Sequence, residues 1–430
     1  MIELLLRPAV LAPVLVLVAF FIHQLFFAGP KRPKIPIVGA KENDWFPFYQ
    51  ATWRNTLNFK AAVQLADRKY RDQPVLIPSL GALNTVLLPR SEIQWVTDQP
   101  DSALDMHTQA IDSLQIDYTA TDPSLVYNPV HHKLITTTLT NQIGNLVPDV
   151  AEETAWGFEK QWGNPSDYQE VCVYDTMRKI VGSVTNRVFV GSPKCRDPAL
   201  LTEARSRDEQ VARPRAQRLS TVVDQTGQGH AILELAASKQ EYIDELRAEI
   251  EGVLAEHGGE WNKRALAKMQ KLDSVMRESA RLNSFVTIGL SRAVIPKDGI
   301  VTPSGVRIPR GFTVNVPSYP VFRDSDIYPD AEEFKPFRFA EQRADESVDY
   351  VKRAAKAFAT TSTDYLAFGH GRNACPGRFF AANELKLMLA HLVLNYDIEL
   401  GGQRPRSSWF GLNRVPPLQA TIRIKKRVKS

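Results

Sequence analysis

Cysteine is scarce in this 430-residue chain, and its scarcity excludes two kinds of protein. The three cysteines, Cys172, Cys195 and Cys375, are odd in number and far apart. This pattern excludes a secreted disulfide framework and indicates a reducing compartment. Cys375 also has no second cysteine or histidine at zinc spacing, so a structural zinc site is not expected.

A strong charge imbalance is also lacking. The formal net charge is +5, with 43% hydrophobic and 23% charged residues, which is typical of a globular protein and excludes wholesale disorder. Much of the excess charge lies in short runs such as Ile422 to Lys429, which favour an acidic surface or partner. Zinc-finger spacings and RNP-like aromatic strands are missing, so we expect no nucleic-acid partner.

Formal charge is absent from residues 9–28, which form an apolar run of the length that a bilayer-spanning helix needs. Lys31, Arg32 and Lys34 follow, and these cations place the rest of the chain on the cytoplasmic side. The alternative is a cleaved signal peptide, but the run is longer than a signal core and lacks a small-x-small cleavage site.

We therefore expect three segments. Residues 1–29 are a single-pass membrane anchor, and residues 30–36 are a stiff, proline-rich basic spacer. Residues 37–430 are a cytoplasmic domain without an internal linker.

The secondary-structure signals predict a fold that is mainly α with a small β part. Residues 75–89 are expected to form a β-hairpin, and helical patterns then dominate to about residue 190. Further helices are predicted over 230–257 and 263–282, the first of them closed by Gly258 and Gly259. Short strands follow over 287–295, 305–309 and 312–318, and a last helix runs from just after Cys375 to residue 394.

The loop before this last helix concentrates glycine around one cysteine. Gly369, Gly371 and Gly377 surround Cys375, although a buried structural thiol would not need them. Glycine is required where a backbone turns left-handed or must approach a flat cofactor closely. Backbone N–H groups and a helix N-terminus provide the electropositive setting that a thiolate ligand needs. The loop therefore predicts a thiolate that holds a metal or cofactor.

The spacing of Phe368, Gly371, Cys375 and Gly377 resembles the haem-ligand loop of cytochrome P450. The resemblance implies that the Cys375 thiolate is the axial ligand of the iron of haem b, and that Phe368, Gly371 and Gly377 belong to the cofactor-binding loop. The alternative is a lone buried cysteine.

Two further motifs are similar to the same family, in the same order. Glu278 and Arg281 are three residues apart and so lie on one helical face, a spacing that alone would mean only a solvated ion pair. Phe334-x-Pro336-x-Arg338-Phe339 resembles the P450 segment whose arginine joins that pair. The resemblance implies a buried Glu278–Arg281–Arg338 network that braces the haem loop.

Haem propionates need cationic or hydrogen-bonding partners, and the resemblance implies Arg292 as one of them; the alternative is an exposed strand arginine. Asn373, beside Arg372, stands where the family usually has arginine or histidine, which weakens one contact. The family's Trp-x-x-x-Arg is missing, and His131 or Lys133 either replaces it or is a surface residue.

The largest departure from the family lies between residues 190 and 237. A long apolar helix with an acid–alcohol pair is expected there, to deliver protons for O–O cleavage. Residues 206–218 are instead charged and polar, and Gly227 and Gly229 weaken a helix further, so residues 206–229 are atypical and the distal helix is shortened. Asp224 and Thr226 either replace the pair or are loop residues.

The resemblance, closest to membrane-bound fungal enzymes of specialised metabolism, implies a haem-thiolate monooxygenase. It would insert one oxygen atom from O₂ into a lipophilic small molecule, such as a terpenoid or another secondary metabolite, with electrons from NADPH through a flavoprotein reductase. Two alternatives follow from the distal departure. One is a P450-like lyase or isomerase, and the other is an inactive, degenerate haem protein.

Overall fold

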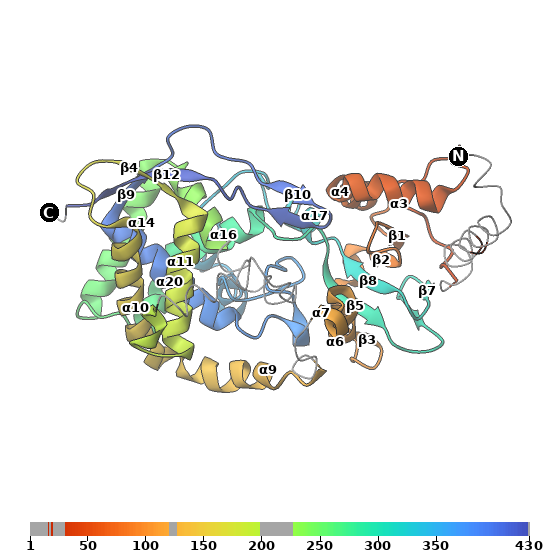
Figure 1. Cartoon of the computed structure of the whole chain (residues 1–430), viewed down its shortest axis with the longest axis horizontal. Coiled ribbons are helices and arrows are strands. Elements are labelled where there is room, and N and C mark those ends of the chain that lie inside the picture. Colours follow the sequence, from red (N-terminus) through yellow and green to blue (C-terminus); the bar gives the residue numbers. More distant parts are fainter. Residues whose placement is uncertain (1–15, 17–18, 20–30, 120–126, 198–226, 429–430) are drawn as a thin grey trace, which may run out of the picture.

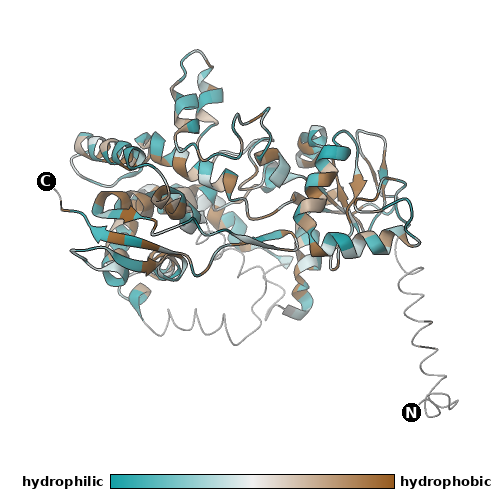
Figure 2. Cartoon of the chain, turned by 90° about the horizontal axis from the view of Figure 1, so that it is seen from above, coloured by the Kyte–Doolittle hydropathy of each residue, from teal (hydrophilic) through white to brown (hydrophobic). Residues whose placement is uncertain are grey.

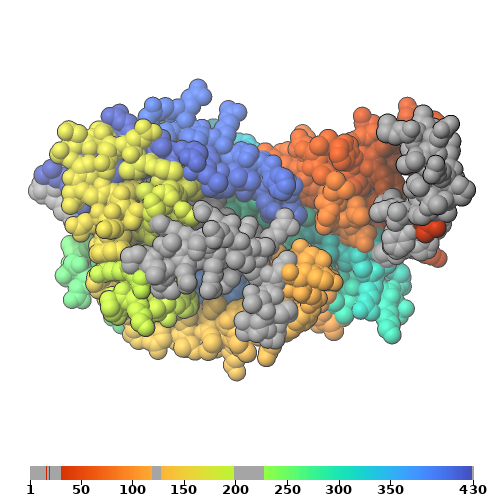
Figure 3. Space-filling view, viewed as in Figure 1, coloured from red at the N-terminus to blue at the C-terminus, as the bar shows by residue number. Residues whose placement is uncertain are grey.

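The computed structural model describes residues 16, 19, 31–119, 127–197 and 227–428 of the chain. It has a larger lobe built mainly of helices and a smaller lobe built around a sheet (Figure 1). In the space-filling view, the early part of the described chain, in red and orange, lies at the smaller lobe (Figure 3). This arrangement confirms a mainly helical fold with a small β part.

Most of the larger lobe is helical. Its main helices are α10 (Thr140–Trp162), α11 (Val173–Phe189), residues 227–236, α14 (Gln240–Glu256), α15 (Lys263–Lys268), α16 (Gln270–Leu282) and α20 (Arg378–Asn395). The other α-helices are α3 (Pro47–Leu57), α4 (Phe59–Lys69), α5 (Ile93–Asp98), α6 (Met106–Leu114), α7 (Ile116–Thr119), α9 (Val130–Leu134), α17 (Ser318–Phe322), α18 (Arg338–Ala344) and α19 (Tyr350–Ala354). Three short 3₁₀-helices of the described chain are η1 (Arg90–Glu92), η3 (Lys194–Arg196) and η4 (Gly371–Asn373), and η2 (Ile135–Leu139) is a short π-helix.

The main sheet has the strand order β1-β2-β8-β5-β3. Its strands are β1 (Val75–Leu76), β2 (Thr85–Leu87), β3 (Leu104–Asp105), β5 (Gly289–Val294) and β8 (Thr313–Val316). Val75 lies opposite Leu87 in an antiparallel pair, which confirms the predicted hairpin. The strands of this sheet are largely hydrophobic, brown in Figure 2, because helices and loops cover them.

Smaller sheets complete the strands. They are β4 (Gln169–Cys172), β12 (Thr421–Lys426) and β9 (Tyr396–Glu399) in one antiparallel sheet, β6 (Ile300–Val301) with β7 (Arg307–Ile308), and β10 (Ser408–Phe410) with β11 (Asn413–Val415).

Helix α20 forms the centre of the larger lobe because it is apolar on nearly all sides, as a fully buried helix must be. Leu385, Met388, Leu389 and Leu392 are buried in the core that α20 shares with α10, α14 and α16. The position of α20 fixes the loop that precedes it.

Two predicted helices are interrupted. Residues 230–257 form two helices, because the Ser238 hydroxyl donates to the Glu234 carbonyl at 2.6 Å and Lys239 is extended. Residues 263–282 are likewise divided at Met269, whose ψ of 76° turns the chain and whose side chain is fully buried. The prediction of continuous helices was wrong at both corners.

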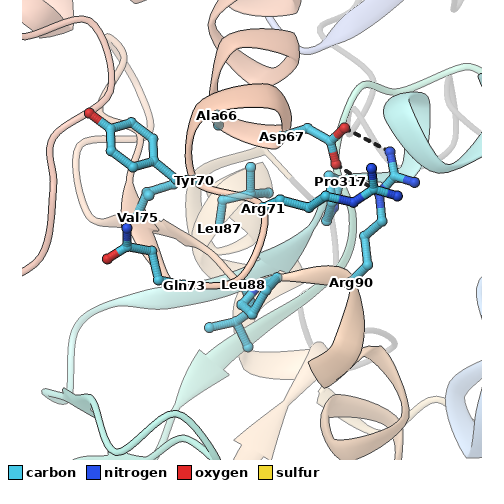
Figure 4. A pocket seen from close by; sticks show the side chains of 11 residues that line it. Ala66, Asp67, Tyr70, Arg71, Gln73, Val75, Leu87, Leu88, Arg90 and Pro317 are labelled. Carbon is cyan, nitrogen blue, oxygen red and sulfur yellow. Dashed lines mark hydrogen bonds and ion pairs between the residues drawn. The ribbon is translucent and has the colours of Figure 1, made fainter. Parts of the chain in front are cut away.

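Paired charges fix α4 to the sheet around a small cleft (Figure 4). The Asp67 carboxylate of α4 accepts hydrogen bonds from Nε and Nη2 of Arg90, each at 2.7 Å. Arg71, two residues after α4, pairs with Asp324 at 3.0 Å, and Arg90 also contacts Asp324. These ion pairs join α4 to η1 and to the segment that follows α17.

The predicted anchor, residues 1–29, lies almost wholly outside the described residues. Within the described ranges, no helix is both long enough and apolar enough to cross a bilayer. Residues 31–36 of the predicted spacer contain neither helix nor strand.

Candidate functional site

The cysteine loop turns twice through left-handed backbone. Gly369 has φ +70° and Gly371 has φ +71°, conformations that side chains rarely adopt. A Cβ added to Gly371 would lie 2.8 Å from the Cβ of Thr97, on α5. The prediction that glycine allows left-handed backbone in this loop is therefore confirmed at Gly369 and Gly371.

Cys375 lies exposed just before the N-terminus of α20. Its backbone N–H donates to the Phe368 carbonyl at 2.7 Å, and its own carbonyl accepts from Nη1 of Arg378 at 2.8 Å. The loop thus closes on itself, and the 18-residue helix behind it presents its positive dipole end to the sulfur. This setting favours an anionic sulfur ligand.

Gly377 differs from the other two glycines. Its φ is −85°, and an added Cβ would meet only Ile135, at 3.9 Å. The fold described here therefore leaves room for a side chain at Gly377. Ile135 belongs to the π-helical turn η2, so a wider helical turn faces the cysteine loop at this point.

The predicted charge network is present and buried. Glu278 accepts from Nε and Nη2 of Arg281, both at 2.8 Å, and from Nε of Arg338 at 3.0 Å. The side chains of Glu278 and Arg281 are fully buried, and that of Arg338 is 6% exposed. The pair of α16 is therefore not a solvated ion pair.

The two arginines also bind backbone carbonyls far along the chain. Nη1 of Arg281 donates to Phe322 at 2.6 Å and to Ala331 at 2.7 Å. Arg338 donates to Pro329 at 2.5 Å. Residues 322–338 are thereby fixed to α16, and every charge of the network has a partner.

Sequence reasoning missed two further residues of α16. Arg277 donates to the Thr360 carbonyl at 2.8 Å and lies 3.6 Å above the Tyr365 ring, and burial lowers its pKa. Asp273 accepts from the Phe358 backbone at 2.7 Å and pairs with Lys386 of α20 at 2.6 Å. Together they hold the segment that leads into the cysteine loop.

A signal for these residues existed in the sequence. Asp273, Arg277 and Arg281 follow one another at intervals of four and so lie on one face of α16. A charged stripe usually indicates a solvated face, and here that stripe is buried.

Arg292 lies in β5 and is only 3% exposed, so the alternative of an exposed strand arginine was wrong. Its guanidinium donates to the Ser291 carbonyl at 2.9 Å, and no carboxylate within the described ranges lies in ion-pair distance of it. Burial lowers its pKa, while Asp101 and Asp105 oppose that shift from farther away. Such a buried cation calls for an anionic ligand.

The other candidates near the loop differ in burial. His131 and Lys133 of α9 are exposed, and Nδ2 of Asn373 points at the Asp101 carboxylate at 3.4 Å. His107, which sequence reasoning missed, has a buried Nε2 atom without a hydrogen-bond partner among the described residues. It follows Asp105, which pairs with Ala293, the neighbour of Arg292 in β5.

A cavity of about 230 Å³ lies beside the first half of the loop. Most of its lining is apolar and comes from three places: the loop at Leu366 to Gly369, the segment from Ser284 to Leu290, and Gly227 at the start of helix 227–236. Cys375 is not part of this lining.

The distal candidates, Asp224 and Thr226, lie outside the described residues. Residues 227–236 are helical, although Gly227 and Gly229 disfavour a helix. Glu234 of this helix pairs with Arg404 at 2.6 Å and accepts from Asn283 at 2.9 Å; burial raises its pKa and Arg404 opposes the rise.

Comparison with known proteins agrees with this geometry. The family model described as Cytochrome P450 matches residues 227–419. Cytochrome P450 monooxygenase 110 of Postia placenta is 29% identical, with 92% of each chain covered. Cytochrome P450 monooxygenase pbrC of Penicillium brasilianum is 26% identical, with 97% of this chain and 96% of the relative covered. Residues 227–419 of the chain are therefore a cytochrome P450 domain.

These findings support a P450 of the fungal type and an enzyme of the monooxygenase kind. The alignments span 488 and 518 positions, more than the 430 residues of this P450. Each alignment therefore includes positions at which the relative has a residue and this chain has none.

The residues of this P450 fit a haem. Gly369 and Gly371 give the loop its left-handed turns, and Cys375 stands at the positive end of α20. The Arg292 guanidinium and the His107 Nε2 atom are buried groups that carboxylates would satisfy. Cys375 would supply the sulfur ligand of the iron, and Arg292 and His107 would bind the propionate carboxylates.

Proposed function

We propose that this P450 is a membrane-anchored haem-thiolate monooxygenase that inserts one oxygen atom from O₂ into a lipophilic small molecule. Its electrons would come from NADPH through a flavoprotein reductase. The observation that carries the proposal is the glycine loop, which presents Cys375 at the end of α20 and rests on the buried Glu278 network.

When bound, haem supplies an iron at which O₂ is activated, a reaction that thiolate ligation favours. The chain's own residues hold and orient the reactants. Cys375 would hold the iron by its sulfur, while Arg277, Asp273 and Lys386 keep the approach to the loop in place. A loop fixed in this way holds the Cys375 backbone in one position.

The cavity supports a lipophilic substrate such as a terpenoid or another secondary metabolite. Val286, Leu290 and Phe358 present apolar surface and exclude water. Ser318 adds one polar group, since its buried hydroxyl has no hydrogen-bond partner within the described ranges. That hydroxyl can orient a substrate oxygen.

Partner and location follow from the charges. Exposed Lys133 and Arg372 lie on the elements next to Cys375 and would attract an acidic reductase surface. Anchoring by residues 1–29 in the endoplasmic reticulum would keep the catalytic domain cytoplasmic, where that reductase and NADPH are available.

A second candidate is an inactive haem protein. The positions that the relatives have and this chain lacks favour it, because a chain without the acid–alcohol pair would deliver protons poorly. Asp224 and Thr226 are the residues that would have to replace that pair. A lyase or isomerase, which needs no such pair, would work without NADPH.

The test is reconstitution of the full chain with a P450 reductase, NADPH, isotopically labelled O₂ and a panel of terpenoids. A product that carries one labelled oxygen, formed only when NADPH is present, supports the monooxygenase. A product formed without NADPH identifies the lyase or isomerase. NADPH oxidation that yields only peroxide identifies a chain that has lost its proton delivery.

A further inference from the structure

Three arginines from distant parts of the chain meet at the end of α16, near α17 and the β10–β11 hairpin (Figure 1). Arg414 and Arg323 both donate to the Leu282 carbonyl. Arg414 and Arg404 both donate to Oδ1 of Asn283, at 2.9 and 3.3 Å. Guanidinium groups that share acceptors lie side by side, so their like charges repel one another. We call Arg323, Arg404 and Arg414 the arginine cluster.

Carboxylates compensate the charge of the arginine cluster only in part. Glu234 pairs with Arg404 at 2.6 Å. Glu332 pairs with Arg323 at 2.5 Å, but its side chain is 73% exposed, and water screens such pairs. Arg414 has no carboxylate of the described chain within ion-pair distance, and burial first and Arg323 second lower its pKa to about 10. The cluster therefore holds excess positive charge.

The arginine cluster also has hydrogen-bond donors without acceptors. Nε of each of its arginines is buried without a hydrogen-bond partner in the described part of the chain. The two Nη atoms of Arg414 are used, one on Asn283 and one on Leu282, so its Nε is the donor left over. A buried donor that has no acceptor costs free energy, and a bound ligand with acceptor oxygens would remove that cost.

Two neutral side chains near the cluster are in the same condition. The Tyr174 hydroxyl and both ring nitrogens of His230 are buried without partners among the described residues, which are 6% and 2% exposed. Burial raises the pKa of Tyr174, and the nearby Arg404 and Arg414 oppose this rise. The same two arginines add to the lowering of the His230 pKa by burial. The region is rich in donors and poor in acceptors, as anion sites are.

The chemistry of the cluster fits a small oxyanion. Phosphate presents several acceptor oxygens, and guanidinium groups bind such oxygens in pairs. Water would accept the same hydrogen bonds but would leave the positive charge unbalanced. The Arg323 side chain is 13% exposed and that of Arg404 is 34% exposed, so the cluster is largely buried but reaches solvent at Arg404. A small ion fits this setting better than a macromolecule.

We propose that the arginine cluster binds one small oxyanion of the phosphate type, which balances its charge and accepts from its free Nε groups. Asn283 directly precedes Ser284, where one wall of the cavity begins, so the bound ion would also fix that wall. The site uses none of the residues of the cysteine loop and does not depend on the proposed monooxygenase reaction.

The test measures thermal unfolding of the haem-loaded full chain at one ionic strength, with chloride alone or with about 10 mM inorganic phosphate. We expect a dissociation constant of about 1 mM or below, and therefore a Tm at least about 1 °C higher in phosphate. Arg414→Gln should keep or raise the Tm in chloride, because it removes a repelled charge, and should lose the phosphate effect. Arg423→Gln is the control, since it alters an arginine of β12 that is 48% exposed, and should respond as the parent does.

A second variant tests the same site with the opposite sign. Glu234→Gln removes the carboxylate that pairs with Arg404, so it should lower the Tm in chloride. Phosphate should then raise the Tm of this variant by more than it raises that of the parent, because the ion replaces the lost charge. An equal or smaller rise would overturn the proposal.

The remaining outcomes are equally decisive. A rise in the parent and in Arg423→Gln that is absent from Arg414→Gln supports the site. A rise that persists in Arg414→Gln shows adventitious binding elsewhere and overturns it, as does a parent that does not respond. Adenosine monophosphate at the same concentration distinguishes the source of the oxyanion. An equal rise supports a site that accepts phosphate monoesters, and a rise with phosphate alone supports a site for the free ion.

Discussion

The two sides of this P450 differ in how far their buried polar groups are paired. Around α16, on the side of Cys375, the charged groups of Glu278, Arg281 and Arg338 are all paired, although the Ser279 hydroxyl and Nε of Arg277 are buried without hydrogen-bond partners among the described residues. Around helix 227–236, the Tyr174 hydroxyl, the Gln228 amide nitrogen and both ring nitrogens of His230 are buried without hydrogen-bond partners among the described residues. Native proteins rarely leave such groups unpaired.

The contrast indicates on which side the buried charges have all of their partners. The network around α16 consists of residues that all lie within the described chain and fit one another. Helix 227–236 instead begins next to the region where the sequence departs from the family, and the relatives have positions that this chain lacks. We infer that the charge network on the thiolate side is complete within the described chain. The buried polar groups around His230 need hydrogen-bond partners from outside the described residues.

The largest effect on stability is expected from removing one glutamate charge beside α16 and comparing it with the loss of one glutamate charge in helix 227–236. Glu278→Gln leaves two buried arginines without a counterion and should lower the free energy of unfolding by about 3–5 kcal/mol. Glu234→Gln should cost clearly less, because its partner Arg404 is 34% exposed. Denaturant titration of the two full-length variants compares them. Equal losses would contradict the contrast.

Glycine substitutions sharpen the contrast within the loop itself. Gly371→Ala meets Thr97 and a left-handed φ, and should lower the free energy of unfolding by about 1–3 kcal/mol. Gly377→Ala should change it by less than about 0.5 kcal/mol before haem is added. If Gly377→Ala nevertheless loses haem, as absorbance per protein would show, the glycine serves the cofactor. A large loss of stability in the haem-free variant would refute this.

The unpaired His230 predicts a pH effect. Burial, and secondarily Arg414 and Arg404, hold its pKa well below the ordinary value, so the folded state keeps the ring neutral. Below pH 6.5 the unfolded state takes up a proton that the folded state refuses, so stability falls as pH falls. His230→Phe should remove up to about 1.4 kcal/mol per pH unit of this loss. Denaturant titrations of the parent and of His230→Phe between about pH 5 and 7 measure this difference. An equal dependence of the free energy of unfolding on pH in the two proteins would contradict the prediction.

A small effect on the stability of the haem-free protein is also expected at Arg292. Because this guanidinium is buried without a carboxylate, Arg292→Leu should leave the haem-free protein within about 1 kcal/mol of the parent. Haem retention should fall several-fold, as dilution of the loaded protein followed by Soret absorbance would reveal. Unchanged retention would remove Arg292 from the cofactor site.

Much of the thiolate side could be predicted from sequence, because its signals are local. The spacing of Cys375 and its glycines, the Glu278–Arg281 step and the hairpin at residues 75–89 each follow from neighbouring residues. The roles of the site residues, the membrane anchor and the partners remain predictions.

The rest depends on contacts between distant residues. The break at Met269 follows from the packing of its buried side chain. Arg277 and Asp273 gain their roles only when residues 357–365 return to α16. The helix that carries His107 lies beside β5, the strand of Arg292, because β3 pairs with β5. Local sequence patterns do not predict these contacts.

The central claim is that Cys375 holds haem through its thiolate. The most direct measurement is the absorbance spectrum of the reduced full-length protein with and without carbon monoxide, beside Cys375→Ser. We predict the red-shifted Soret band of thiolate-ligated haem in the parent and its loss in the variant. An unshifted band in the parent, or the same band in both proteins, would contradict the account.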